Sequence, residues 1–264
     1  MTFEVAISTM NKTYDEIFEM LKSENIHCNC LVINQCDKND YYSTSIGNSC
    51  VRIICTDERG LARSRNMAIA NCKSDILLIG DDDLIYYDGF DKTITETYEK
   101  NPNVDVALFN IDTYDRIFSL KESKIPYPLI SHFTSQQYSF RVSAIKQKNI
   151  SFNPQFGAGS RIVQFGEENL FLADCYKKRL QIRYFPQKIL KNEDCIDSSW
   201  FKGMNNKEYI RDKGVVYYAI YGKFFFVYIL RFLIKQHKNI KPFSMLQAFV
   251  IAWSGKDFYK ELQK

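Results

Sequence analysis

The sequence predicts an α/β fold with a parallel sheet, followed by a helical C-terminal extension. Two observations carry this prediction. Short apolar runs alternate with segments of helical periodicity over residues 3–111, as in chains that form parallel sheets. The apolar run at 76–79 also ends directly at Gly80 and three aspartates, and open α/β sheets bind ligands where strands end. At 264 residues, the chain can form one large or two small domains.

The strands and helices of the first half are predicted from the spacing of apolar residues and from residues that cap helices. A helix is expected after Thr13, because Glu16 completes a capping box and Ile17, Met20 and Leu21 have helical spacing. Further helices are expected over 61–72 and over 90–100, where Asn101-Pro102 ends the second. Strands are expected where apolar residues run together, over 3–8, 30–34, 51–55, 76–79 and 104–111.

The middle of the chain is less regular. Pro126 and Pro128 indicate a loop, and the glycines of 157–160 indicate a flexible one. A helix is expected over 170–178. Extended segments are expected over 138–145, 150–154 and 182–185, the last closed by Pro186.

Cysteine and histidine usage excludes several kinds of site. The eight cysteines contain no C-x-x-C pair, and the three histidines leave little for a zinc site or a Ser-His-Asp arrangement. Residues 1–4 lack a basic start and a long apolar stretch, so no secretory signal is expected. Reduced thiols in a cytoplasmic protein are the simplest interpretation.

Asp81, Asp82 and Asp83 place three like charges side by side at a strand end. Even in water, two such charges a few ångströms apart repel by about 1 kcal/mol. A divalent cation such as Mg²⁺ or Mn²⁺ would remove this repulsion, since hard cations take carboxylate oxygens. The alternative is a solvated turn rich in aspartate.

Four segments in order resemble inverting family 2 glycosyltransferases with the GT-A fold. They are the polar turn Ser8-Thr9, the helix start from Gly60 to Asn66 (GLARSRN), the triple Asp at 81–83, and Gly166-Glu167-Glu168, which is similar to the family's G-E-D acceptor motif. The resemblance covers residues 3 to about 190. It implies a Rossmann-like, mixed but mainly parallel central sheet flanked by helices.

The resemblance also implies roles for individual residues. Asp83 would ligate Mn²⁺ or Mg²⁺, with Asp81 supporting it. The base that takes the acceptor proton would be Glu168, although Glu167 stays open because this chain has Glu where the family usually has Asp. The nucleotide-sugar donor would contact Ser8, Thr9, Asn34, Asp37, Gly60, Arg63, Arg65, Asp81 and Asp82.

Several of these roles have simpler alternatives. Arg63 and Arg65 could lie on a solvated helix face, and Asp37 could be a turn former. A metal-binding His that many relatives carry after the strand at 182–185 is missing, and Glu193 or Asp194 would have to replace it. An inactive subunit of a glycan-synthesis complex, with the same fold, is the alternative function. A nucleotidyltransferase is disfavoured because residues 8–11 form no Gly-rich basic loop.

The predicted domains are 1–200, the catalytic part, and 201–264, the helical extension. Within the first, 1–115 would bind the nucleotide sugar and 116–200 the acceptor. From Lys202 onward there are twelve Lys or Arg and four Asp or Glu, with apolar stretches at 215–234 and 243–253. A helix lying on an anionic membrane is favoured over core or dimer packing and over a spanning helix.

The expected activity is transfer of a sugar from a UDP-sugar or similar donor, with inversion, to a hydroxyl of a glycan or lipid-linked acceptor. The expected location is the cytoplasm, with peripheral contact at the inner face of the cell membrane through the extension. No nucleic-acid partner is expected.

Overall fold

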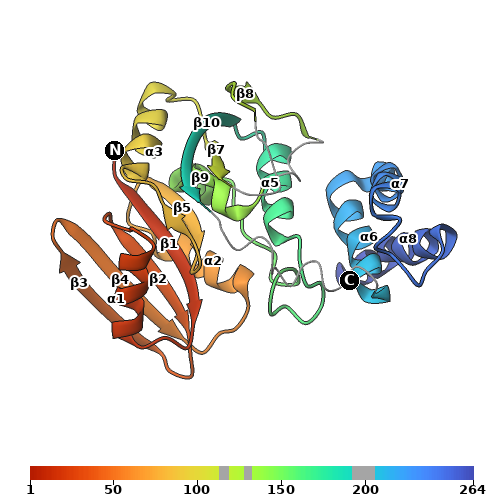
Figure 1. The fold of residues 1–264 in the computed structure, drawn as a ribbon, viewed down its shortest axis with the longest axis horizontal. Coiled ribbons are helices and arrows are strands. Elements are labelled where there is room, and N and C mark those ends of the chain that lie inside the picture. The colour runs from red at the N-terminus through yellow and green to blue at the C-terminus, as the bar shows by residue number, and fades with distance from the viewer. Residues whose placement is uncertain (113–118, 128–132, 192–205) are drawn as a thin grey trace.

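The computed structural model describes residues 1–112, 119–127, 133–191 and 206–264, which form a large sheet flanked by helices (Figure 1). The strands are β1 (Phe3–Met10), β2 (Cys30–Gln35), β3 (Asp40–Ile46), β4 (Ser49–Thr56), β5 (Ile76–Asp81), β6 (Ile85–Tyr86), β7 (Val106–Asp112), β8 (Ser123–Lys124), β9 (Tyr138–Arg141) and β10 (Ile182–Lys191). The helices are α1 (Tyr14–Ser23), α2 (Leu61–Asn71), α3 (Phe90–Lys100), α4 (Val142–Gln147), α5 (Glu167–Lys177), α6 (Lys207–Tyr221), α7 (Phe225–Gln236) and α8 (Met245–Leu262), with short 3₁₀ turns η2 (Ser135–Gln137) and η3 (Gly222–Phe224).

The sheet is mixed, with a parallel centre. Its order is β3-β4-β2-β1-β5-β9-β7-β10-β6, and β8 pairs with β10. Strands β4, β2, β1 and β5 run parallel, whereas β9 is antiparallel to both β5 and β7. In the register of the parallel strands, Ser8 lies beside Asp81 and Thr9 beside Asn34, so the predicted polar residues meet at one edge of the sheet. This architecture confirms the mixed, mainly parallel fold that the family resemblance implies.

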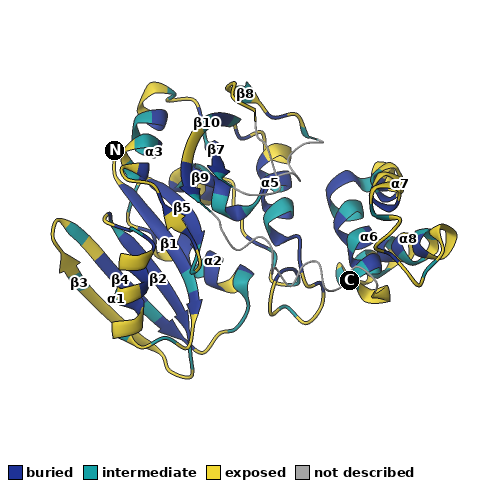
Figure 2. Cartoon of the chain, viewed as in Figure 1, coloured by how far each residue is buried: buried dark blue, intermediate teal, exposed yellow. Residues whose placement is uncertain are grey.

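Alternating residues of the central strands pack into two separate core layers, because successive side chains of a strand point to opposite faces. Ala6, Leu31 and Ile33 pack with α2 and α5. Their neighbours, such as Val5 and Val32, pack with α1 and α3 on the other face. Figure 2 shows these central strands almost wholly buried, as their apolar runs predict.

Several segments differ from the sequence predictions, among them the two-residue strands β6 and β8, which were not predicted. Strand β3 was not predicted, because it is a mostly exposed antiparallel strand at the sheet edge with few apolar residues. The segment expected over 138–145 is a strand only to Arg141 and continues as α4. Strand β10 runs on through Pro186 to Lys191. The proline lies where the register of β10 against β7 shifts, at an irregularity that tolerates a missing N–H donor.

The C-terminal extension is helical, as predicted, but its first apolar stretch is broken. Gly222, at φ 54°, separates α6 from α7. Helices α6 and α8 cross closely, since a Cβ at Gly214 would lie 1.7 Å from the Ala252 carbonyl oxygen. Val216 and Ile220 of α6 belong to the same core layer as α5. The predicted domain boundary at 200 lies outside the described residues, so the division into domains stays a prediction.

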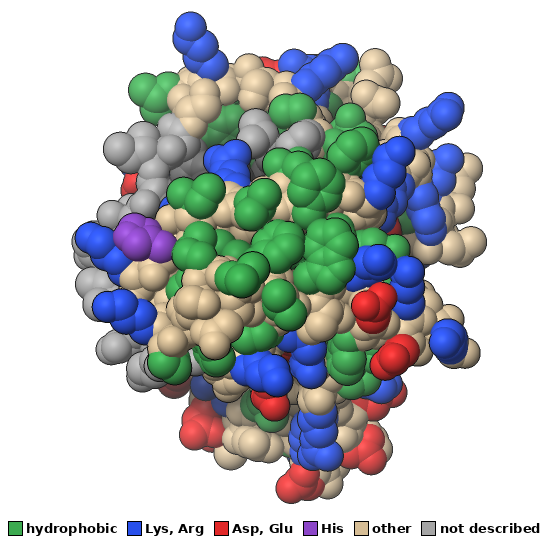
Figure 3. All heavy atoms as spheres, turned by 90° about the vertical axis from the view of Figure 1, so that its right-hand side faces the viewer, with side chains coloured by type: hydrophobic (Ala, Val, Ile, Leu, Met, Phe, Trp, Pro, Cys, Tyr) green, Lys and Arg blue, Asp and Glu red, His purple; other side chains and the backbone are tan. Residues whose placement is uncertain are grey.

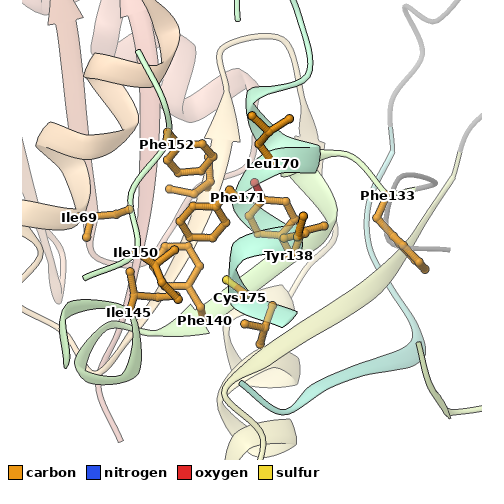
Figure 4. Packing of buried hydrophobic residues seen from close by; sticks show 14 of the residues in the cluster. Ile69, Phe133, Tyr138, Phe140, Ile145, Ile150, Phe152, Leu170, Phe171 and Cys175 are labelled. Carbon is orange, nitrogen blue, oxygen red and sulfur yellow. The ribbon is translucent and has the colours of Figure 1, made fainter. Parts of the chain in front are cut away.

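Phe171 lies at the centre of the core layer that holds α5 (Figure 4). Its ring stacks on Phe152 at 4.2 Å between centroids and on Tyr138 at 5.8 Å, and it contacts Phe140 at 5.5 Å. These rings come from β9, from the segment after α4 and from α5. The stack therefore fixes α5, and the glutamates at its start, against the sheet.

Replacing Phe171 with Ala should lower the free energy of unfolding by about 3–5 kcal/mol, because a fully buried ring leaves a cavity. Urea denaturation followed by circular dichroism measures this loss. Tyr176 is the control on the same helix, since it is 41% exposed, and Tyr176→Ala should cost about 1 kcal/mol or less. Equal losses in the two variants would contradict the central place of Phe171.

Candidate active site

The triple Asp lies at the carboxyl ends of the parallel strands. Asp81 is the last residue of β5, beside Ser8 at the end of β1. Thr9 donates its hydroxyl proton to Asp82 Oδ2 at 2.5 Å, and Lys12 Nζ lies 3.8 Å from the same oxygen. Ser8 in turn accepts a hydrogen bond from Ser64 of α2 at 2.7 Å. The predicted residues Ser8, Thr9, Asp81 and Asp82 therefore form one cluster.

Arg65 of α2 joins this cluster to the other half of the site. Its side chain is almost wholly buried. Its Nη2 donates to Asp81 Oδ1 at 2.9 Å and to Ser135 Oγ at 2.8 Å, while Nη1 donates to Glu167 Oε1 at 2.9 Å. Burial lowers the pKa of Arg65, but the carboxylates of Asp81 and Glu167 outweigh it and raise the pKa. A planar guanidinium suits this role, because it can hold several acceptors in a fixed geometry.

Glu167 and Glu168 begin α5, as acidic residues often begin helices. Glu167 is 2% exposed and tightly enclosed: a Cβ at Gly157, where φ is 98°, would lie 2.7 Å from its Cδ atom. Glu168 keeps partial exposure, and its Oε2 accepts a hydrogen bond from the Ser135 backbone at 3.0 Å. Desolvation and the negative charge of Glu167 raise the pKa of Glu168 to about 7. This is the range in which a carboxylate can act as a base at neutral pH.

The turn η2 contributes residues that sequence reasoning missed. Ser135 contacts both Arg65 and Glu168, and Gln136 Nε2 donates to Asp81 Oδ2 at 3.1 Å. The available local signal is the capping box formed by Thr134 and Gln137, which fixes the turn. The sequence spacing of these residues does not reveal that the turn lies between β5 and α5 in space, where it contacts both.

Two other predicted donor residues lie close to the cluster but make internal contacts. The buried Asn34 amide donates to the Lys12 carbonyl at 2.6 Å and accepts from the Lys12 amide, which fixes the turn after β1. Gly60, with φ 115°, precedes α2. Its carbonyl accepts a hydrogen bond from Gln35 Nε2 at 2.9 Å, and its amide donates to Gln35 Oε1 at 3.1 Å. In this structure both residues shape the backbone around the strand ends.

The remaining two residues predicted to contact the nucleotide sugar, Asp37 and Arg63, are exposed. The Asp37 carboxylate, 97% exposed, pairs with Arg59 at 2.5 Å beyond the end of β2. Arg63 is exposed on α2, whereas Arg65, two residues later, points into the protein. The alternative prediction, a position on a solvated helix face, therefore agrees with the structure for Arg63 but not for Arg65. Contact of either arginine with a donor stays a prediction.

The carboxylates of the triple Asp are the candidate metal ligands. Both oxygens of Asp81 accept hydrogen bonds, from Arg65 and from Gln136, and Asp83 is exposed. Over the described ranges, no three His, Cys, Asp or Glu side chains gather as a metal site. Glu193 and Asp194 lie outside these ranges. The residues present fit a cation held by one or two carboxylates and otherwise by the phosphates of a ligand, as Mg²⁺ commonly is.

Glu24, after α1, is a buried acid close to the triple Asp. Its side chain is 4% exposed, so its carboxyl group is shielded from water. Desolvation, followed by the charge of Asp82, raises the pKa of Glu24 to about 9. Glu24 is thus neutral at pH 7, and a fourth negative charge beside the cluster is avoided.

Because buried Glu24 holds its proton in the folded chain, the protein should become less stable as pH rises and this proton is lost. The pKa of Glu24 is about 9 in the folded chain, against an ordinary value of 4.5. Its contribution to the free energy of unfolding is therefore fully present below about pH 4.5 and is lost as pH rises through 9. The free energy of unfolding should fall by up to about 1.4 kcal/mol per pH unit within that window. Denaturation of Glu24→Gln between pH 5 and 9 should lack this fall. The exposed Glu19→Gln should retain it, and an unchanged slope in Glu24→Gln would contradict the neutral form.

Comparison with known proteins supports the family resemblance. The model of the family described as glycosyl transferase family 2 matches residues 5–163. No curated protein matches the chain. Similar solved structures include Staphylococcus aureus TarS 1-349, with TM-score 0.61 and 13% identity over 100% of this chain and 92% of that one. The same protein with UDP-GlcNAc gives TM-score 0.60 and 12% identity over 99% and 92%. With UDP it gives 0.58 and 15% over 94% and 74%.

At these identities the likeness to TarS shows the fold alone, which agrees with the mixed sheet and the C-terminal helices of this chain. The family match is the stronger finding, because it covers more than half of the chain and includes the residues from the end of β1 to the loop before α5. This protein belongs to glycosyl transferase family 2.

Proposed function

We propose that this protein transfers a sugar from a UDP-sugar to a hydroxyl of a glycan or lipid-linked acceptor, with inversion at the anomeric carbon. The observation that carries the proposal is the placement of Glu168, an acid with a pKa near 7, in one hydrogen-bonded network with the strand-end residue Asp81. Family membership supports the reaction class. The TarS complexes with UDP-GlcNAc and UDP support the choice of donor.

On the donor side, Asp83 would hold Mn²⁺ or Mg²⁺ and Asp81 would support it. Such a cation offsets the negative charge that develops on a leaving diphosphate. The protein's own contribution here is the arrangement of Ser8, Thr9 and Asp82 around the strand ends. This arrangement keeps the acidic turn in place beside β1 for the donor to bind.

On the acceptor side, Glu168 is the proposed base. Its carboxylate takes the proton of the acceptor hydroxyl while that oxygen bonds to the anomeric carbon. The bond from this carbon to the diphosphate oxygen breaks on the opposite face, which gives inversion. Glu167 is less suited to this step, because it is buried and its Oε1 is engaged by Arg65. Glu167 is thus a positioning residue, and Glu168 keeps the solvent access that an acceptor needs.

The second candidate is a subunit that binds a nucleotide sugar without turnover. It is favoured by one observation: Arg65 and Gln136 engage both oxygens of Asp81, the first acid of the D-x-D motif. The two candidates differ in one measurable property. A binding subunit would be stabilised by UDP-sugars but would neither transfer the sugar nor hydrolyse the donor.

A location in the cytoplasm, at the inner face of the cell membrane, belongs to the same proposal. UDP-sugar donors and a lipid-linked acceptor would meet at such a surface. The apolar and basic C-terminal helices support this location.

Glu168→Gln should lower sugar transfer by about 100-fold or more, because it removes the base. It should keep the rise in melting temperature that a UDP-sugar with Mn²⁺ gives, since the donor would bind at the strand ends. For the unmodified protein, kcat/KM should rise with pH through about 7 and then level off, as Glu168 loses its proton. Turnover of UDP-sugars with a panel of glycan and lipid-linked acceptors measures both effects.

Two further variants complete this test. Glu19→Gln, exposed on α1, should retain full activity. Asp83→Asn should lose the part of the thermal shift that depends on Mn²⁺. Full transfer activity in Glu168→Gln would overturn the role of Glu168, and a thermal shift without turnover in the unmodified protein would favour the binding subunit.

A further inference from the structure

Helices α7 and α8 present an apolar face to solvent. On α7 it contains Val227, Leu230 and Ile234, and on α8 Leu246, Val250 and Trp253, which are 38–73% exposed. Spacings of three, four and seven residues bring each set to one side of its helix. Figure 3 shows hydrophobic side chains gathered over the middle of this end of the molecule. We call these six residues the α7–α8 face. Exposed apolar patches of this kind usually mark an interaction surface.

The exposure is not a failure of these helices to pack. Their other sides are buried, with Ile229 and Leu233 of α7 against Ala248 and Ala252 of α8 in a core cluster of their own. Helix α7 therefore has a buried apolar side and, next to its exposed Arg231 and Lys235, a second apolar strip that no part of the described chain covers. An exposed apolar strip beside basic residues is typical of helices that lie on a lipid surface.

The charge around the α7–α8 face indicates what covers it. Residues 222–256 contain Lys223, Arg231, Lys235, Lys238, Lys241 and Lys256, and no Asp or Glu. The first five are exposed. Figure 3 shows Lys and Arg side chains on several sides of the apolar centre, with a few Asp and Glu side chains among them at its edge. Apolar side chains with a Trp and a basic border match the surface of an anionic bilayer, where lipid phosphates lie just above the acyl chains.

We propose that the α7–α8 face docks on the surface of an anionic phospholipid bilayer. Its apolar side chains enter the headgroup region, and the surrounding Lys and Arg side chains contact lipid phosphates. A second copy of this chain is a poorer occupant, since two basic borders facing each other would repel. Docking of this kind does not require sugar transfer.

The face lies on the bilayer rather than spanning it. The helical stretch Lys207–Gln236 is long and apolar enough to cross a membrane by length and composition. However, the break at Gly222 divides it, and α6 packs against α5 and α8. Its buried residues, such as Val215 and Ile220, are therefore covered by the protein itself. Among the described C-terminal helices, α7 and α8 have outer sides that are open to lipid.

Docking would also fix where the proposed acceptor side faces. Val216 of α6 lies directly over Gly166, the residue before Glu167: a Cβ at Gly166 would be 2.6 Å from Val216 Cγ2. Helix α6, which packs against α7 and α8, therefore links the helices of the α7–α8 face to the start of α5. If the proposed function holds, the base Glu168 is held at a constant distance from the bilayer, which suits a lipid-linked acceptor.

Flotation with vesicles tests the docking without any sugar nucleotide. The full chain is mixed with vesicles of phosphatidylcholine alone, or of phosphatidylcholine and phosphatidylglycerol in equal parts. We expect flotation with the anionic vesicles only, and weaker binding as salt is raised. Ile234→Ser combined with Leu246→Ser should weaken binding by about tenfold or more, because two apolar side chains no longer enter the lipid. Lys235→Gln combined with Lys238→Gln should reduce it as well.

The matched control is Ile46→Ser combined with Leu120→Ser, since these residues are 51% and 83% exposed but lie on β3 and just before β8. This variant should float like the unmodified protein. Equal flotation of the control and of Ile234→Ser with Leu246→Ser would overturn the proposal, as would no binding to anionic vesicles at low salt.

Sedimentation velocity tests for the competing occupant, a second copy of this chain. A dimer that is lost in Ile234→Ser with Leu246→Ser, in a protein that does not bind vesicles, would assign the face to a second copy. Loss of sugar transfer alone, with vesicle binding intact, would bear on the proposed function and not on docking.

Discussion

The buried guanidinium of Arg65 is the interaction on which the candidate site depends. It joins three segments that are far apart in sequence: the end of β5 through Asp81, the turn η2 through Ser135, and the start of α5 through Glu167. Burying one cation between two carboxylates is stabilising only while all partners are present. Removal of one member of such a group typically costs about 3–5 kcal/mol, because it leaves an uncompensated buried charge.

The network also sets the chemistry of its neighbour Glu168. Because Arg65 engages Glu167, the two adjacent glutamates are placed differently. One is enclosed and paired, whereas the other is partly exposed with a pKa near 7. Two adjacent acids with different surroundings commonly take different roles in a reaction. Helix α5, which carries them, is fixed against the sheet by Phe171 and packs on Val216 of α6. Helix α6 in turn packs against α7 and α8, so it links the acidic end of α5 to the proposed lipid surface.

Much of the fold and part of the site could be predicted from the sequence. The buried strands β1, β2 and β5 have continuous apolar runs, and the triple Asp ends one of them. The exposed edge strand β3 has no such run, and β10 passes through Pro186 because a register shift tolerates it. These depend on pairing partners that a local pattern does not contain.

The residues of the site that belong to sequence motifs were predictable, whereas those placed by tertiary contacts were not. Motif order located Asp81, Glu167, Glu168 and Arg65, but the burial of Arg65 came from the fold. Ser135 and Gln136 lie more than fifty residues from Asp81 in sequence and carry no motif of their own. Glu24 shows its significance only through burial beside the acidic turn. Long-range contacts of this kind are set by tertiary packing.

A double-mutant cycle on Arg65 and Glu167 tests most directly that a buried cation joins the two halves of the site. The free energy of unfolding is measured for Arg65→Met, Glu167→Gln and both together. We predict that the double variant loses less stability than the sum of the single variants, with a coupling of about 1–3 kcal/mol, as for other contacting pairs. The exposed Arg63→Met, paired with Glu167→Gln, should be additive within about 0.5 kcal/mol. Additive losses for Arg65 and Glu167 would contradict the account.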